Sequence, residues 1–206
     1  MKKQTNPLNS EDVKSIEYPG FTPEEAFSLS ACLGEYHRTF ILLRQYDERD
    51  TPEDADDHKE GYYLEFNKAN LIIKELKRYL AENGENTQNF GVARGDGAEK
   101  VLHNVYQTWD GKELYPSLES KAAHLFYFLI KDHLFIDGNK RITAFLLLWF
   151  MDMNDMLIMG RDDRTLSYNT VYALAVFVAE SSPKDKEIVI KLIHNIIMSH
   201  NKALPE

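Results

Sequence analysis

The segment that most constrains the fold is residues 144–151, AFLLLWFM, in which every residue is apolar. A helix that is apolar all round is buried on every side, so we expect a central helix from near Asn139 to about Met153. Directly before the apolar run, residues 133–141 contain a histidine, an aspartate, a glycine, an asparagine and two cations. The sequence therefore places a polar cluster at the start of its most deeply buried helix.

The remaining pattern is also mainly helical. Apolar positions at helical spacing, and capping residues such as Ser117 and Ser182, predict further helices. Their expected ranges are 22–46, 61–80, 118–133, 166–180 and 183–199. Between residues 101 and 115, the dipeptide Asp110-Gly111 predicts the tight turn of a short β-hairpin. We therefore expect an all-α fold around a central buried helix, with one small hairpin before the polar cluster.

The composition excludes some classes of binding partner and some cellular locations. The formal net charge of −9 disfavours a non-specific nucleic-acid binder, because phosphate backbones demand clustered cations. The acidic stretch 46–60 is expected to be a solvated loop. The single cysteine, Cys32, excludes an intramolecular disulfide, and its apolar neighbours predict a small buried side chain. The N-terminus lacks the apolar core of a secretory signal, and no apolar run could span a bilayer, so we expect a cytoplasmic protein without a membrane partner.

The polar cluster has several features that favour the binding of an anion. A helix that begins inside a core presents unpaired backbone N–H groups and a positive dipole end, here at Gly138–Arg141. Gly138 allows close backbone approach, while Lys140 and Arg141 add positive charge. Cations at a helix N-terminus are unfavourable unless an anion compensates them. This arrangement predicts a bound phosphate.

Two further residues complete a reactive set. Asp137 stands beside the predicted phosphate, where a carboxylate is the usual protein ligand of Mg²⁺. His133 lies one turn earlier and can accept a proton from a hydroxyl at neutral pH. Taken alone, each has a simpler explanation, a core histidine and a common Asp-Gly-Asn turn. Together with the anion site they predict group transfer from a nucleotide.

These residues carry a resemblance. The stretch HLFIDGNKRITA, residues 133–144, resembles the motif of the Fic/Doc family, whose members transfer part of a nucleoside triphosphate to a protein hydroxyl. The resemblance implies that His133 is the general base, Asp137 holds Mg²⁺, and Phe135 packs the loop into the core. It also implies that Gly138, Asn139, Lys140 and Arg141 bind the nucleotide, with Asn139 orienting the phosphates. The expected target-aligning flap comprises Val105, Tyr106, Gln107, Thr108 and Trp109.

Two positions favour the Doc branch of the family. Members that transfer AMP usually have glycine at the position of Lys140 and a second arginine at that of Ala144. The Doc branch has lysine, lacks that arginine and transfers the terminal phosphate. We therefore expect phosphate transfer from ATP or another nucleoside triphosphate to a Ser, Thr or Tyr hydroxyl. AMP transfer and a non-catalytic nucleotide-binding scaffold are the alternatives.

The resemblance also bears on regulation and domain organisation. The sequence contains no [S/T]-x-x-x-E-[G/N] motif of the kind found in the inhibitory helix of many Fic proteins. Any inhibition is therefore expected to come from a separate antitoxin or by another route, and the resemblance offers a toxin as one role. We expect residues 1–89 to form an N-terminal helical extension packed on the core, and residues 90–206 to form the Fic/Doc domain.

Overall fold

The computed structural model describes residues 20–35, 43–44, 61–157 and 166–201 of the chain. Its contacts divide the chain into two units, Met1–Thr51 and Pro52–Glu206. In the first unit, helix α1 spans Pro23–Glu35, and its start is closed by reciprocal hydrogen bonds between Thr22 and Glu25. The predicted start of this helix is therefore confirmed. Most of its predicted continuation to residue 46, and the acidic loop 46–60, lie outside the described residues.

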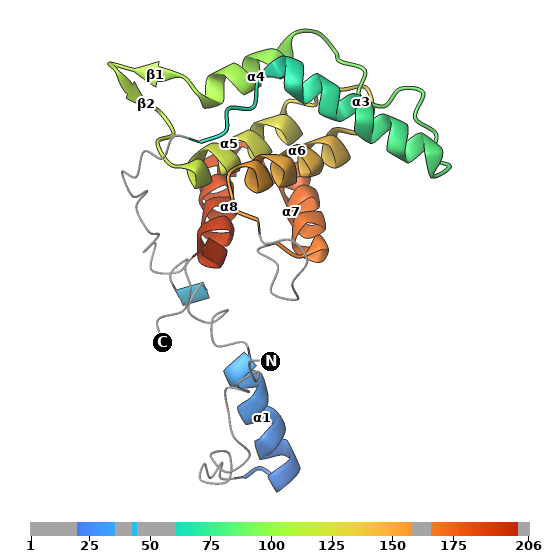
Figure 1. Cartoon of the computed structure of the whole chain (residues 1–206). Coiled ribbons are helices and arrows are strands. Elements are labelled where there is room, and N and C mark those ends of the chain that lie inside the picture. Colours follow the sequence, from blue (N-terminus) through green and yellow to red (C-terminus); the bar gives the residue numbers. More distant parts are fainter. Residues whose placement is uncertain (1–19, 36–42, 45–60, 158–165, 202–206) are drawn as a thin grey trace, which may run out of the picture. The chain divides into compact units, whose positions relative to one another are not determined.

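Helices build the second unit. Its elements are α3 (Phe66–Glu82), α4 (Gly97–Val105), β1 (Thr108–Trp109), β2 (Lys112–Glu113), α5 (Leu118–Lys131), α6 (Asn139–Met153), α7 (Tyr168–Glu180), a 3₁₀ turn (Pro183–Asp185) and α8 (Lys186–Asn201). Helix α5 is central, because α4, α6, α7 and α8 all pack against it. Figure 1 shows α3 and α4 on one side of the α5–α6 pair and α7 and α8 on the other. The predicted all-α class is confirmed.

The two central helices begin and end close to their predicted positions. Ser117 caps α5, since its side chain accepts a hydrogen bond from the Ser120 N–H at 3.0 Å. Helix α6 has the predicted bounds, but it is not buried on every side. Ile142 is 0% exposed and Phe150 is 0% exposed, whereas Phe145 is 38% exposed. The prediction of complete burial is therefore wrong, and the partly open side of α6 lines a groove described below.

Residues 61–64, expected to begin a helix, are not helical. The Tyr62 N–H donates to Asn154 Oδ1 at 2.6 Å, and the Leu64 N–H donates to the Tyr106 hydroxyl at 3.0 Å. Gly61 also lies so close to Leu118 that a Cβ would approach it to 2.4 Å. These tertiary contacts outweigh local helix propensity, and α3 begins only at Phe66.

The segment before the hairpin also differs from its prediction. Residues 97–105 form helix α4, and Val105 is 1% exposed in the core, so the strand predicted from residue 101 is wrong. Val101, Leu102 and Val105 form an apolar helical stripe, which burial against α5 stabilises. The hairpin itself is confirmed but short, pairing Thr108 with Glu113 and Trp109 with Lys112. Its turn places Asp110 and Gly111 at φ of 51° and 75°, as a tight hairpin turn requires.

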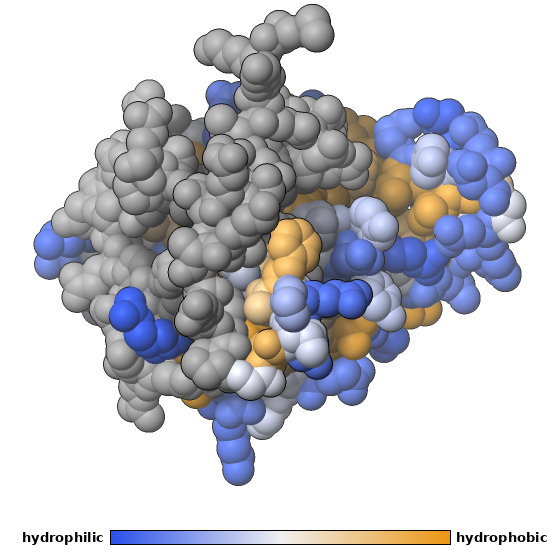
Figure 2. Space-filling view, turned by 90° about the horizontal axis from the view of Figure 1, so that it is seen from below, coloured by the Kyte–Doolittle hydropathy of each residue, from blue (hydrophilic) through white to orange (hydrophobic). Residues whose placement is uncertain are grey.

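Apolar side chains are exposed as well as buried. Figure 2 shows them in orange among blue polar side chains on the face seen from below. Cys32 on α1 is exposed, so its predicted burial is wrong.

None of the described helices is both long and apolar enough to cross a membrane. Helix α3 belongs to the second unit, and the predicted boundary between residues 89 and 90 stays a prediction.

Candidate functional site

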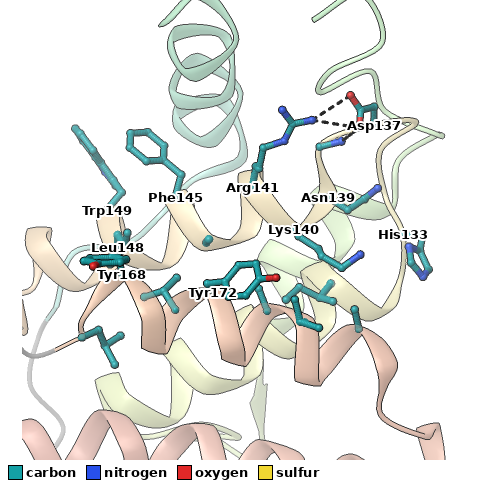
Figure 3. Close-up of a pocket in the computed structure, with 18 of the residues that line it drawn as sticks. His133, Asp137, Asn139, Lys140, Arg141, Phe145, Leu148, Trp149, Tyr168 and Tyr172 are labelled. Atoms are coloured by element: carbon teal, nitrogen blue, oxygen red, sulfur yellow. Dashed lines mark hydrogen bonds and ion pairs between the residues drawn. The ribbon is translucent and has the colours of Figure 1, made fainter. Parts of the chain in front are cut away.

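A groove of about 1180 Å³ runs along α6 and α7 (Figure 3). Its charged lining gathers where α6 begins, and its lining further along α6 and α7 is mostly apolar. The polar part is lined by His133, Asp137, Gly138, Asn139, Lys140 and Arg141, and the apolar part includes Ala144, Phe145, Leu148, Trp149, Tyr168, Val171, Tyr172, Ala175 and Val176. The volume is ample for a nucleotide-sized ligand.

The start of α6 opens into this groove. Gly138 is the residue before the helix and has φ of 90°, a left-handed conformation that favours glycine. The first α-helical bond joins the Ile142 N–H to the Gly138 carbonyl at 2.8 Å, so the N–H groups of residues 139–141 precede the helical ladder. Unpaired N–H groups at the positive end of a helix attract an anion. The predicted anion site is therefore open to the groove.

Lys140 and Arg141 leave the first turn of α6 on different sides. In Figure 3, Lys140 extends toward α7, and Arg141 lies on the other side of the helix beside Asp137. Within the described part of the chain, Lys140 has no ion-pair partner, although it stands at the positive end of a helix dipole. An anion bound in the groove would offset the repulsion between the Lys140 charge and the positive end of the helix dipole.

Arg141 is already engaged. One of its terminal nitrogens pairs with Glu85, in the turn after α3, and the other lies 3.3 Å from Asp137 Oδ2. Asp137 Oδ1 also accepts the Gly138 N–H at 2.7 Å. Both arginine and aspartate side chains are close to half exposed, at 43% and 46%. An anion that approached Arg141 would therefore compete with the carboxylates of Glu85 and Asp137.

Asn139 closes the loop before α6. Its Oδ1 accepts the Phe135 N–H at 2.9 Å, and its Nδ2 donates to the Phe135 carbonyl at 2.8 Å. Phe135 itself is 2% exposed and packs into the core, where the sequence places it. The described contacts of the Asn139 amide thus hold the loop, and its predicted role in orienting phosphates stays a prediction.

His133 stands just beyond α5, which ends at Lys131. Its backbone has φ of 45°, an uncommon conformation for a residue with a Cβ, and its side chain is exposed at the edge of the groove. The helix expected to run to residue 133 therefore ends earlier, and the simpler explanation of His133 as a core histidine does not hold, because its side chain is exposed. Exposure leaves the imidazole accessible to an incoming hydroxyl.

The predicted flap residues are distributed differently. Val105 is buried in α4, Tyr106 and Gln107 follow that helix, and Thr108 and Trp109 form β1. Trp109 is 78% exposed. None of the five lines the groove, and a target-aligning role stays a prediction for Tyr106, Gln107, Thr108 and Trp109. Assigning it to Val105 is wrong, because helix and burial remove it from any exposed strand edge.

Sequence reasoning missed two features of the site. Tyr168 and Tyr172, which line the groove from α7, carry no motif that would single them out. The segment 90–94 pairs with the loop 134–137, and no local pattern in its sequence marks this pairing. In the described part of the chain there is no group of three or more His, Cys, Asp or Glu side chains suited to a metal ion.

Comparison with known proteins agrees with this geometry. Residues 65–151 match the model of the Fic/DOC family, a stretch that includes the hairpin, α5, the polar loop and most of α6. This stretch of the chain is therefore similar to a Fic/Doc domain, and proteins of that family are typically transferases that move part of a nucleotide to proteins. Neither the curated proteins nor the solved structures gave a match.

Proposed function

We propose that the protein transfers the terminal phosphate of ATP, or of another nucleoside triphosphate, to a hydroxyl of a target protein. The match of residues 65–151 to the Fic/DOC family model supports nucleotide-dependent modification of proteins. The choice of the terminal phosphate rests on the lining of the groove beyond the anion site.

The observation that carries the proposal is the change in lining along α6. Cations line the groove at Lys140 and Arg141, but the next lining residue of α6 is Ala144, followed by apolar and aromatic side chains. The charged residue that lines the groove further along α6 is Asp152, which would repel phosphates. An aromatic, apolar groove suits a nucleobase. The described residues therefore favour a nucleobase beyond Ala144 and phosphates at the start of α6.

This orientation of the nucleotide determines which of its phosphates lies nearest to His133, the proposed general base. A nucleotide whose base lies between α6 and α7 extends its phosphates toward the N-terminal end of α6, where His133 also lines the groove. The terminal phosphate would then be the one nearest His133. Arg161 and Arg164, which could supply a further cation, lie outside the described residues.

In the proposed reaction, the hydroxyl oxygen of the target attacks the terminal phosphorus while His133 accepts the hydroxyl proton. The bond between that phosphorus and the bridging oxygen breaks, and ADP leaves with the electron pair. The N–H groups of residues 139–141 and the side chains of Lys140 and Arg141 would stabilise the negative charge on the phosphates. Positioned donors of this kind need no reorganisation during the reaction.

Asp137 would hold Mg²⁺ together with the phosphates. The carboxylate lines the groove next to the anion site and is close to half exposed, so one oxygen can face the ion while Oδ1 keeps the Gly138 N–H. The ion would neutralise phosphate charge and orient the nucleotide. Chelation should weaken ATP binding, which calorimetry measures without any target protein.

The test uses ATP labelled at one phosphate at a time, incubated with the protein, Mg²⁺ and a cell lysate. We expect a lysate protein to acquire label from the terminal phosphate and none from the α-phosphate, and EDTA to abolish the labelling. Label from the α-phosphate would establish AMP transfer instead. Nucleotide binding without labelling of any protein from either position would establish a non-catalytic scaffold. The target protein and a separate antitoxin stay predictions.

A further inference from the structure

The loop that carries the motif is held by a distant segment of the chain. Residues 90–94, between α3 and α4, run beside residues 134–137 and exchange backbone hydrogen bonds with them. The Gly91 N–H donates to the Asp137 carbonyl at 3.1 Å, and the Arg94 N–H donates to the Leu134 carbonyl at 2.8 Å. In the opposite direction, the Ile136 N–H donates to the Val92 carbonyl at 2.8 Å. We call residues 90–94 the strap.

Arg94 adds a side-chain bond at the centre of the loop. Its Nε donates to the Phe135 carbonyl at 3.1 Å, and the same oxygen accepts the Asn139 Nδ2 donor at 2.8 Å. Phe135 and Asn139 are thereby joined to each other and to the strap. A hydrogen bond from a charged donor is stronger than one between neutral groups. Arg94 therefore braces the residue that opens α6.

Phe90 lies at the other end of the strap. Its ring is 1% exposed, and a Cβ on Gly138 would lie 2.5 Å from it. The Arg141 guanidinium carbon stands 4.9 Å from the centre of the same ring, a cation–π contact. One buried ring thus sets the space available at Gly138 and one face of Arg141.

We propose that Arg94 and Phe90 are positioning residues of the anion site, a role that rests on the proposed nucleotide-binding function. Neither side chain lines the groove, so both act through residues 135–141. Their contacts fix the loop before a phosphate arrives. Donors that are fixed in advance bind and stabilise an anion better than donors that must be ordered on binding.

Arg94 offers the cleaner test, because it is exposed and its removal leaves no core cavity. Arg94→Met deletes the bond to Phe135, whereas Arg94→Lys keeps a charged donor. Lys100→Met is the matched control, since Lys100 is an exposed cation of nearby α4 that pairs with Asp96 and not with the loop. Calorimetry measures the Kd of Mg-ATP, and thermal unfolding measures the Tm of each variant.

We expect Arg94→Met to weaken Mg-ATP binding about tenfold with little change in Tm, as the loss of one charge-assisted hydrogen bond predicts. Arg94→Lys should recover most of the affinity, and Lys100→Met should remain within about twofold of the wild type. Unchanged affinity in Arg94→Met, or an equal loss in Lys100→Met, would overturn the positioning role.

A second measurement needs no nucleotide and separates this proposal from the proposed function. Hydrogen exchange at the amides of residues 135–141 should be faster in Arg94→Met than in the wild type, and wild-type-like in Lys100→Met. Unchanged exchange in Arg94→Met would refute positioning. Faster exchange together with a wild-type protein that binds no nucleotide would uphold the positioning of the loop and refute the nucleotide function.

Discussion

At the scale of single residues, His133 combines exposure with an uncommon backbone conformation at the edge of the groove. We predict that His133→Ala keeps Mg-ATP affinity within a few-fold, because the phosphates are held by other residues. Transfer to protein should fall about 10²-fold or more, the usual contribution of a general base. Calorimetry and label transfer measure the two effects. Full transfer activity in a folded His133→Ala protein would exclude the role of general base.

Glu85 provides a second test at this scale, since its carboxylate occupies Arg141. Glu85→Gln should tighten Mg-ATP binding two- to fivefold, because an exposed ion pair contributes up to about 1 kcal/mol and must be broken by an incoming phosphate. Glu82→Gln is the control, since Glu82 pairs with Arg78 at 2.7 Å on the surface of α3. Equal affinity in the two variants would show that Arg141 is not the residue that binds the phosphates.

At the scale of elements, Tyr106 joins the end of α4 to the non-helical residues before α3. Its hydroxyl accepts the Leu64 N–H at 3.0 Å, and burial raises its pKa to about 12, although the Leu64 bond acts in the opposite direction. The unfolded chain loses this proton near the ordinary pKa of 10.0, before the folded protein does. Stability contributed by the neutral hydroxyl is therefore present below pH 10 and is lost as pH rises through 12.

The corresponding prediction compares the wild type with Tyr106→Phe by denaturant unfolding. At pH 8 the variant should be less stable by about 1–2 kcal/mol, because the Leu64 N–H loses its acceptor. By pH 11 the wild type should have lost roughly 1.4 kcal/mol through Tyr106 alone, so the gap between the two proteins should narrow. A gap that widens with pH would contradict the raised pKa.

The same scale shows what sequence could predict. Helices α5, α6 and α7 were predictable because capping serines, the Asp-Gly-Asn turn and regular apolar spacing mark their ends locally. The absence of helix at residues 61–64 was not predictable, since it depends on contacts with Asn154 and Tyr106 far along the chain. Helix α4 was obscured by flanking glycines, and its apolar stripe was mistaken for a strand.

Some features of the candidate site could likewise be predicted from the sequence, and others could not. The motif residues 133–141 are contiguous, so their chemistry could be predicted from their order. The strap, Glu85 and the tyrosines of α7 meet the motif only through tertiary structure, and no local pattern marks them. The open side of α6 also escaped prediction, because an all-apolar helix gives no sign of which face lines a ligand groove.

At the scale of the whole second unit, α5 and α6 form a centre that the other helices cover from two sides. The predicted anion site lies at the start of α6, while α7 supplies the opposite wall of the groove. The central claim is that a Mg-nucleotide lies in this groove with its base beyond Ala144 and its terminal phosphate beside His133.

The most direct measurement of that claim is a crystal structure of the His133→Ala variant with Mg²⁺ and a non-hydrolysable ATP analogue. We predict a base between Ala144 and Tyr172, phosphates on the N–H groups of residues 139–141, and the terminal phosphate closest to residue 133. An α-phosphate beside residue 133, or a nucleotide bound outside the groove, would contradict the account.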